Sequence, residues 1–193
     1  MSRPRLVIFA KAPIMGRAKT RLAADIGPVH AKRIYRAMTA RVLQNVQHPK
    51  WETVLAVTPP RWLGTVPEWQ GIEQYAQTSG SLSPRLSEAF SSQSPTVVIG
   101  TDSPQITRSD IDRAFTCLRS RGAVFGPADD GGFWLMGLRG PARAGTFADV
   151  NCSTETALAD VERNISGPVH YLRTLTDVDD AQALAQVRQT LRF

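Results

Sequence analysis

Cysteine and histidine are scarce in this sequence, with two cysteines and three histidines among 193 residues. Cys117 and Cys152 lie 35 positions apart and outside any CxxC spacing. We therefore expect two reduced thiols and no disulfide framework. The histidines are scattered along the chain, so nothing in their placement indicates a zinc site.

Long apolar runs are also missing. The first run, residues 6–10, is shorter than the ~7–15-residue core of a signal peptide. No segment approaches the roughly 20 apolar residues that a membrane-spanning helix needs. We therefore expect a cytoplasmic protein that has no membrane partner.

Basic tracts of the kind that bind nucleic acid are absent although the net charge is +6. The positive charges are mostly dispersed arginines, with no tract of basic and aromatic residues and no recognisable nucleic-acid module. The composition therefore favours anionic small molecules over nucleic acid as partners.

What the sequence does contain is a regular alternation of buried-strand and amphipathic-helix patterns. Strands are expected at residues 6–10, 53–57, 72–76, 96–100, 123–126, 133–138 and 169–172. Helices are expected at 29–46, 84–91, 110–121, 155–163 and 179–191, with N-caps at Ser83, at Thr107 or Ser109, and at Ser153 or Thr154. The pattern predicts one α/β domain, residues 1–193, with a doubly wound, mostly parallel sheet and helices on both faces.

A basic loop is predicted after the first strand. Lys11, Arg17, Lys19 and Arg21 fall within eleven residues, and Pro13 and Gly16 shape the backbone between them. Open α/β sheets bind ligands at the carboxyl ends of their strands, so the loop is a candidate site for several phosphate oxygens. Ordinary solvated charge is the alternative interpretation.

Two nucleotide-binding motifs are excluded in this loop. A Walker A loop needs G-x-x-x-x-G-K-[ST], yet Ala18 precedes Lys19 and Pro13 stands at the position of the first glycine. The sequence here also lacks G-x-G-x-x-G.

Acidic residues follow two other predicted strands. Asp102 lies between Thr101 and Ser103 after the strand 96–100, where its carboxylate could hold Mg²⁺ if that strand neighbours the first one. Asp129 and Asp130 precede two glycines that allow close backbone approach to a ligand. Turn chemistry is the alternative for both loops. One cationic and two anionic clusters at three strand ends predict a metal–nucleotide complex lying across the sheet.

The loop residues also support a resemblance. It is carried by Lys11, Ala12, Pro13, Gly16, Lys19, Thr20, Arg21 and Leu22, by residues 100–104 (GTDSP), by residues 127–133 (PADDGGF) and by residues 177–180 (DVDD). The chain resembles the GT-A-like nucleotide-diphospho-sugar transferase superfamily. Within it, the likeness is to the arsenosugar-biosynthesis-type glycosyltransferases, alongside the molybdenum-cofactor and 2-phospho-lactate guanylyltransferases. The resemblance covers nearly the full length and implies a Rossmann-like, GT-A sheet.

The resemblance also implies a set of site residues. Nucleotide binding is expected at Ala10, Lys11, Ala12, Pro13, Gly16, Lys19, Arg21, Arg85, Thr101 and Ser103. Asp102 is the expected ligand of Mg²⁺ or Mn²⁺, and Asp129, Asp130, Gly131 and Gly132 are expected to contact the acceptor. The expected catalytic residues are Lys19, Arg21 and Asp130, and either Asp129 or Asp130 is expected to orient the acceptor or a metal-bound water.

The sequence departs from the family in three places. Ser83 stands where a glycine usually precedes the helix at Arg85, residues 151–154 lack the usual tryptophan, and Asp102 is a lone carboxylate where many GT-A enzymes have D-x-D.

Together these features predict a metal-dependent transferase that acts on a nucleotide-activated donor and an unknown small-molecule acceptor. A nucleotide sugar is the favoured donor. A guanylyl- or cytidylyltransferase that releases pyrophosphate is the alternative enzyme. A non-catalytic nucleotide-binding sensor is the alternative of another class.

Overall fold

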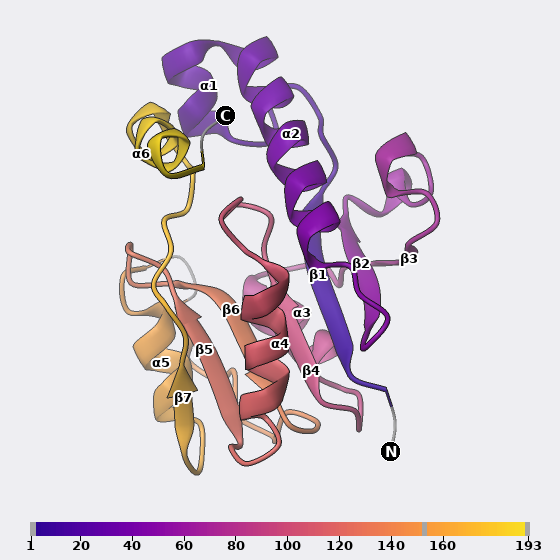
Figure 1. The fold of residues 1–193 in the computed structure, drawn as a ribbon, viewed down its shortest axis with the longest axis vertical. Helices are drawn as coiled ribbons and strands as arrows, with labels where there is room; N and C mark the ends of the chain where they lie inside the picture. Colours follow the sequence, from indigo (N-terminus) through magenta and orange to yellow (C-terminus); the bar gives the residue numbers. More distant parts are fainter. Residues whose placement is uncertain (1–2, 152–153, 192–193) are drawn as a thin grey trace.

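Seven strands form one sheet in the computed structural model, which describes residues 3–151 and 154–191 (Figure 1). The strands are β1 Arg5–Lys11, β2 Glu52–Thr58, β3 Glu73–Ala76, β4 Thr96–Ile99, β5 Ala123–Pro127, β6 Phe133–Leu138 and β7 Val169–Tyr171. The α-helices are α1 Thr20–Ile26, α2 Pro28–Val46, α3 Leu82–Ala89, α4 Arg108–Cys117, α5 Ala157–Arg163 and α6 Ala181–Leu191. Short 3₁₀ turns occupy Pro60–Trp62 and Pro67–Trp69.

The strand order is β3-β2-β1-β4-β6-β5-β7. β1 is parallel to β2 on one side and to β4 on the other, while β6 is antiparallel to both β4 and β5. The chain therefore runs outward from β1 to β3 and then returns to the far side of β1, so the strand order reverses between β1 and β4. Ligands bind at such a switch point in open α/β sheets. The predicted doubly wound, mostly parallel sheet is confirmed.

Alternation along β1 divides the core between the two faces of the sheet. Leu6 and Ile8 pack with apolar residues of α2 and α4, whereas Val7 packs with α3 and α5. β1 is buried on both sides, as its unbroken apolar run predicts. A third cluster joins α1, the first half of α2 and α6 above the carboxyl edge of the sheet, where Figure 1 shows these helices together.

The tryptophans act as packing residues. Trp51 and Trp69 are each 2% exposed within the core cluster, and Trp62 packs against it. Trp62 and Trp69 therefore contribute to the core.

Several predicted boundaries were wrong. The predicted basic loop does not extend to Arg21, because α1 begins at Thr20 and includes Arg21. The N-cap of α3 is Ser81 and not Ser83, because the helix begins at Leu82 and Ser83 lies inside its first turn.

Two further helices begin later than predicted. α5 is capped at Thr156 instead of Thr154, and Ser153 lies outside the described residues. α6 begins at Ala181 instead of residue 179. Its amino end is held by the Asp25 carboxylate, which accepts the Ala181 amide at 3.0 Å.

The α4 boundary was half right. Thr107 is its N-cap and forms a capping box with Asp110, so Thr107 and not Ser109 starts the helix. The helix ends at Cys117, four residues before the predicted end, where tighter turns follow.

Two expectations from the composition can be compared with the structure within the described residues. In the described part of the chain, no helix combines the length and apolar character of a membrane span. Cys117 is a free cysteine, while the predicted second thiol, Cys152, lies outside the described residues.

Candidate functional site

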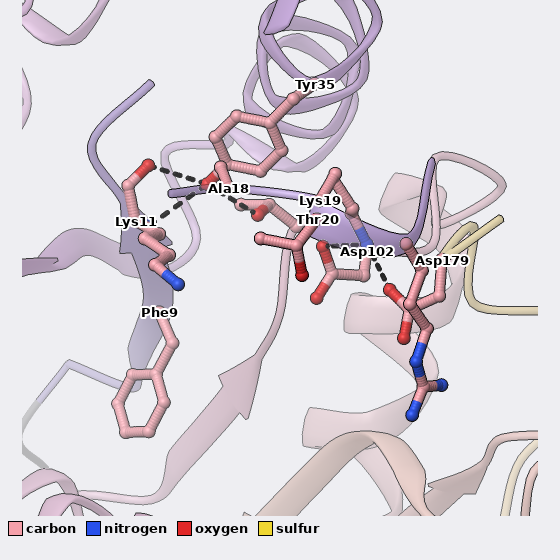
Figure 2. Close-up of a pocket in the computed structure, with 10 residues that line it drawn as sticks. Phe9, Lys11, Ala18, Lys19, Thr20, Tyr35, Asp102 and Asp179 are labelled. Atoms are coloured by element: carbon pink, nitrogen blue, oxygen red, sulfur yellow. Dashed lines mark hydrogen bonds and ion pairs between the residues drawn. The ribbon is translucent and has the colours of Figure 1, made fainter. Parts of the chain in front are cut away.

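A pocket of about 270 Å³ opens where β1 and β4 end. Its walls come from five separate parts of the chain: the end of β1, the start of α1, α2, the turn after β4 and the segment before α6 (Figure 2). The lining residues are Phe9, Lys11, Ala18, Lys19, Thr20, Arg21, Tyr35, Thr101, Asp102 and Asp179. The cationic segment and the Asp102 turn, predicted separately, thus meet in one cavity.

The ammonium group of Lys19 is the centre of this pocket. Its Nζ lies 2.6 Å from Oδ1 of Asp102 and 2.6 Å from Oδ1 of Asp179. The Lys19 side chain is only 4% exposed, against 44% and 49% for its two partners. Burial alone would lower the pKa of Lys19, but the two carboxylates outweigh burial and raise it. Lys19 is therefore a buried, permanently charged group.

The backbone at Lys19 turns the chain sharply into α1. Its φ of 54° and ψ of 54° lie in the left-handed region, which is unfavourable for a residue with a Cβ. The surrounding structure holds this conformation, and it places the Lys19 side chain against the Asp102 turn.

Tyr35 of α2 ties the ends of β1 and β4 together. Its hydroxyl donates to the Lys11 carbonyl at 2.7 Å and accepts the Lys11 amide at 3.1 Å, while the Thr101 hydroxyl donates to it at 3.4 Å (Figure 2). Burial raises the pKa of Tyr35. The sequence pattern assigned Tyr35 only to an apolar stripe, so its role at the site was missed.

The segment before α6 adds two carboxylates. Asp179 pairs with Lys19, and Asp177 accepts a hydrogen bond from the Ser103 hydroxyl. The Val178 amide donates to the Asp102 carbonyl at 2.9 Å, which fixes this segment beside the turn after β4. The only sequence signal for these residues was the late acidic motif of the resemblance, which carried no role.

Asp102 and Asp179 fit a hard divalent cation. Mg²⁺ and Mn²⁺ prefer oxygen donors, and Mg²⁺ commonly takes one or two protein carboxylates while phosphates and water complete its shell. Among the described residues, no three acidic, histidine or cysteine side chains are already grouped as a metal site. The two carboxylates that share Lys19 could serve as a donor pair for a metal bound together with phosphates.

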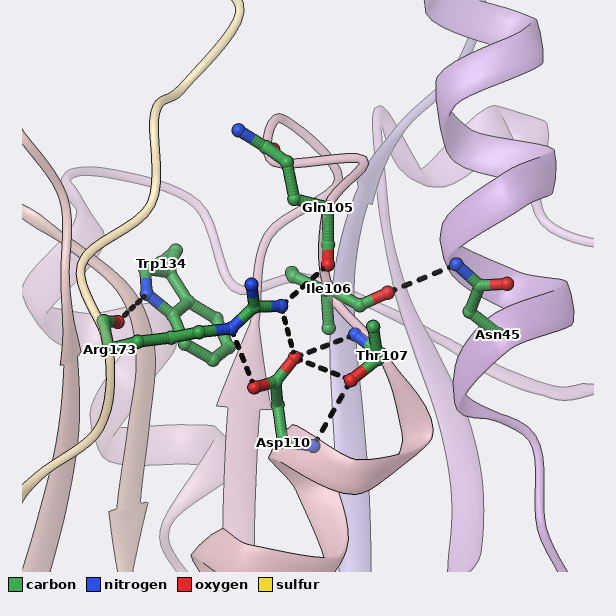
Figure 3. Close-up of polar contacts among 7 residues, drawn as sticks. All are labelled: Asn45, Gln105, Ile106, Thr107, Asp110, Trp134 and Arg173. Atoms are coloured by element: carbon green, nitrogen blue, oxygen red, sulfur yellow. Dashed lines mark hydrogen bonds and ion pairs between the residues drawn. The ribbon is translucent and has the colours of Figure 1, made fainter. Parts of the chain in front are cut away.

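Arg173 anchors the segment that carries Asp177 and Asp179 (Figure 3). Its guanidinium donates to both carboxylate oxygens of Asp110, at 2.9 and 2.8 Å, and to the Gln105 carbonyl at 2.8 Å. The indole of Trp134 donates to the Arg173 carbonyl at 3.1 Å. Burial would raise the pKa of Asp110, but the hydrogen bonds from Arg173 and Thr107 outweigh it and lower the pKa.

Replacing Arg173 with methionine should destabilise the protein by about 1–2 kcal/mol, because the Asp110 carboxylate loses its charged donors. The pKa of Asp110 is lowered in the folded state. The contact with Arg173 therefore stabilises the protein at pH values above 3.8, the ordinary pKa of an aspartate. This stabilisation is lost as the pH falls through the lower pKa that Asp110 has in the folded protein. Urea unfolding at pH 7 and pH 3 should show the difference between variant and wild type shrinking at pH 3. The control Arg163→Met, on a surface pair with Asp160, should change little at either pH.

A second, open pocket of about 1230 Å³ adjoins the first and shares Arg21 and Asp179 with it. Its other lining residues are Asp129, Asp130, Gly131, Gly132, Thr154, Glu155 and Thr156. The Asp130 carboxylate accepts the Gly132 amide at 2.9 Å, and the Gly131 carbonyl accepts the Leu158 amide at 3.3 Å. The loop 129–132 is thus packed against the start of α5.

The predicted site residues separate into two groups. Those that line the two pockets are Lys11, Lys19, Arg21, Thr101, Asp102, Asp129, Asp130, Gly131 and Gly132. Ser103 lines an adjacent, largely apolar cavity of about 240 Å³ that shares Phe9 and Asp102 with the first pocket.

The structure does not bring the other predicted residues to these pockets. Ala10 and Ala12 are fully buried, and Gly16 lies in an exposed turn. Pro13 contacts a separate small cavity near Trp69. The remaining residue, Arg85, lies on α3. Its guanidinium donates hydrogen bonds to the Gln77 side chain and to the Gly80 carbonyl.

Asp177→Asn should stabilise the metal-free protein at neutral pH. Burial, with added repulsion from Asp102 and Asp130, raises the pKa of Asp177 from 3.8 to about 6. This difference corresponds to about 3 kcal/mol of lost stability when the carboxylate is charged. The gain should be complete above pH 6 and should vanish below pH 4, where the carboxyl is protonated in both states.

Urea unfolding in the presence of a chelator, at pH 7.5 and pH 3.5, measures the effect of Asp177→Asn. Asp149→Asn, on an exposed carboxylate, is the control and should show no such pH-dependent gain. Equal stability of Asp177→Asn and wild type at pH 7.5 would contradict the prediction.

Comparison with known proteins identifies a family and a fold. Residues 40–154 match the model of a family described as "Uncharacterized protein conserved in bacteria (DUF2064)". No curated protein matches the chain. A protein of Desulfovibrio desulfuricans G20, provisionally described as a nucleotide-diphospho-sugar transferase, superposes with a TM-score of 0.86 at 24% identity, covering 98% of this chain and 88% of that one.

Two more distant structures share the fold. Rv0371C of Mycobacterium tuberculosis H37Rv, solved in complex with manganese, has a TM-score of 0.60 at 14% identity and covers 98% of this chain and 100% of its own. The 4-diphosphocytidyl-2C-methyl-D-erythritol synthase of Anaerococcus prevotii DSM 20548 has a TM-score of 0.67 at 8% identity, with 98% of each chain covered. The GT-A-like resemblance predicted from the motifs is thus confirmed at the level of the fold.

Proposed function

Because this chain belongs to the DUF2064 family of bacterial proteins and has a transferase-type fold, we propose that it is a metal-dependent transferase that uses a nucleotide sugar as donor. The observation that carries the proposal is the convergence of Lys19, Arg21 and Asp102 in one pocket at the switch point of the sheet. Residues 1–193 are proposed to act as one domain. The cytoplasmic location stays a prediction.

Each charged side chain of the pocket is proposed to have one role. Lys11, Lys19 and Arg21 neutralise the charge that develops on the leaving diphosphate, which is electrostatic stabilisation by preorganised donors. Asp102 and Asp179 hold Mg²⁺ or Mn²⁺ together with the donor phosphates. When bound, the metal supplies further charge neutralisation there.

The second pocket is proposed to receive the acceptor. Its loop 129–132 lines this pocket together with Arg21 and Asp179, which also line the first pocket. The oxygen of an acceptor hydroxyl bound there would form a bond to the sugar carbon of the donor while the bond from that carbon to the diphosphate oxygen breaks. The nucleoside diphosphate would leave, and the hydroxyl proton would be released to solvent. Asp130 would orient the acceptor hydroxyl or a water, which is a positioning role.

A nucleotidyltransferase is the second candidate function. Asp102 is a lone carboxylate after β4 and not part of a D-x-D pair, and one structure of the same fold is a diphosphocytidyl synthase. The manganese complex of Rv0371C supports a divalent metal in either case.

Products distinguish the two functions. A thermal-shift panel of nucleotides and nucleotide sugars, with and without Mn²⁺, identifies the donor, because a bound ligand raises the melting temperature. Incubation of that donor with Mn²⁺ and a mixture of small acceptors should then release a nucleoside diphosphate. Release of pyrophosphate from a nucleoside triphosphate would favour nucleotidyl transfer. The transferase proposal fails if no nucleotide stabilises the protein and neither product forms.

A further inference from the structure

The free protein already holds a positive charge between the two carboxylates proposed to bind the metal. The Lys19 ammonium lies 2.6 Å from an oxygen of each, which is a normal distance for a strong charge-assisted hydrogen bond. Lys19 is almost fully buried, while about half of each carboxylate side chain faces solvent. The ammonium therefore occupies the inner position and leaves the outer faces of Asp102 and Asp179 open.

A divalent ion and this ammonium compete for the same two carboxylates. A metal bound to Asp102 and Asp179 while Lys19 stays in place would lie a few ångströms from a positive charge in a partly desolvated pocket, where like-charge repulsion is strong. The two carboxylates cannot fully serve both cations. Each cation therefore weakens the binding of the other at this pair of carboxylates.

A phosphate bound in the pocket would offer the Lys19 ammonium a second partner. Lys11 and Arg21 line the same cavity, so phosphates held by them would lie within the pocket that Lys19 also lines. Lysine is a mobile point charge on a flexible stem and can exchange a carboxylate for a phosphate partner.

We propose that Lys19 is a tethered cation that blocks the metal site of the free protein, and that metal enters only together with nucleotide phosphates, to which the Lys19 ammonium then moves. The inference rests on the proposed function and adds its order of binding. The protein takes up a metal–nucleotide complex, and free metal binds weakly.

Binding of Mn²⁺ alone tests the block. Mn²⁺ is titrated into wild type and Lys19→Met without nucleotide, and free Mn²⁺ is measured by electron paramagnetic resonance. Lys19→Met should bind Mn²⁺ at least about 10-fold more tightly than wild type, because two carboxylates lose their competing cation. Lys11→Met removes the same charge from the same pocket but has no contact with the carboxylates, so it should raise the affinity no more than about threefold.

Equal or weaker Mn²⁺ binding by a folded Lys19→Met overturns the proposal. Circular dichroism melts establish that the variant is folded. Addition of Asp102→Asn to Lys19→Met should remove the gained Mn²⁺ affinity, which locates it at this site.

The wild-type protein provides a second measurement that does not depend on the variant folding. The ¹⁵Nζ resonance of buried Lys19, assigned by its absence in Lys19→Gln, should not shift with Mg²⁺ alone and should shift when Mg²⁺ and inorganic pyrophosphate are added together. A shift with Mg²⁺ alone overturns the proposal, as does a resonance unchanged by bound Mg²⁺–pyrophosphate.

These outcomes are separable from those that test the function. Tighter Mn²⁺ binding by Lys19→Met without any transfer product supports the block and contradicts the transferase. Transfer by wild type with no change in Mn²⁺ affinity in Lys19→Met supports the transferase and contradicts the block.

Discussion

Asp102→Asn should lower kcat/KM for transfer by about 10³-fold or more and should remove the metal-dependent gain in nucleotide affinity. Asparagine keeps the shape of the side chain but removes the charge that Asp102 contributes to the metal and to Lys19. Lys19 retains its contact with Asp179 at 2.6 Å, so the pocket should stay assembled. Steady-state kinetics with Mn²⁺ and isothermal titration with the donor measure both effects.

The control for Asp102→Asn is stability. The Asp102 side chain is 44% exposed, so the melting temperature of Asp102→Asn should stay within a few degrees of that of wild type. A folded Asp102→Asn that keeps wild-type transfer rates would remove Asp102 from the metal site, and the proposed mechanism with it.

Gly131→Ala should destabilise the protein by about 3–5 kcal/mol, the largest stability effect that we expect from one methyl group. Gly131 has a φ of +85°, and a Cβ there would lie 2.1 Å from the Glu155 carbonyl oxygen. The alanine therefore adds backbone strain and also forces the loop 129–132 away from the start of α5. Urea unfolding measures the loss, and transfer should fall as the acceptor pocket opens.

Gly145→Ala is the matched control for this clash. Gly145 has the same φ of +85°, but in the described part of the chain nothing beyond its sequence neighbours lies within 4 Å of an added Cβ. Alanine there adds only backbone strain, about 1 kcal/mol. Equal losses in the two variants would show that the contact with Glu155 has no effect and that backbone strain alone matters.

The strands could be predicted because their residues are consecutive and apolar. β6 coincides with the predicted range 133–138, yet its position and direction did not follow from the sequence. An apolar run without alternation carries no information about orientation, and β6 enters antiparallel between β4 and β5. Long-range pairing decides its place, and propensity does not encode it.

The candidate site was predictable where charged residues follow the end of a strand. Asp102 and the cations of the basic segment were found because parallel strands β1 and β4 bring their carboxyl ends together. Asp179 was not assigned a role, since its contact with Lys19 spans 160 residues of sequence and no local pattern marks it. The left-handed backbone at Lys19 has no sequence signal either, because lysine has no preference for that conformation.

The pairing of Lys19 with Asp179 also has a consequence for synthesis on the ribosome. Leu22 of α1 packs with Ala31 and Met38 of α2 and also with Leu184 and Val187 of α6, so α1 gains its last partners only when α6 has emerged. Until then the nascent polypeptide carries Lys19 and Asp102 without the segment that covers them. The protein should therefore complete its proposed phosphate-binding pocket as one of the last events of its synthesis, after the sheet has formed.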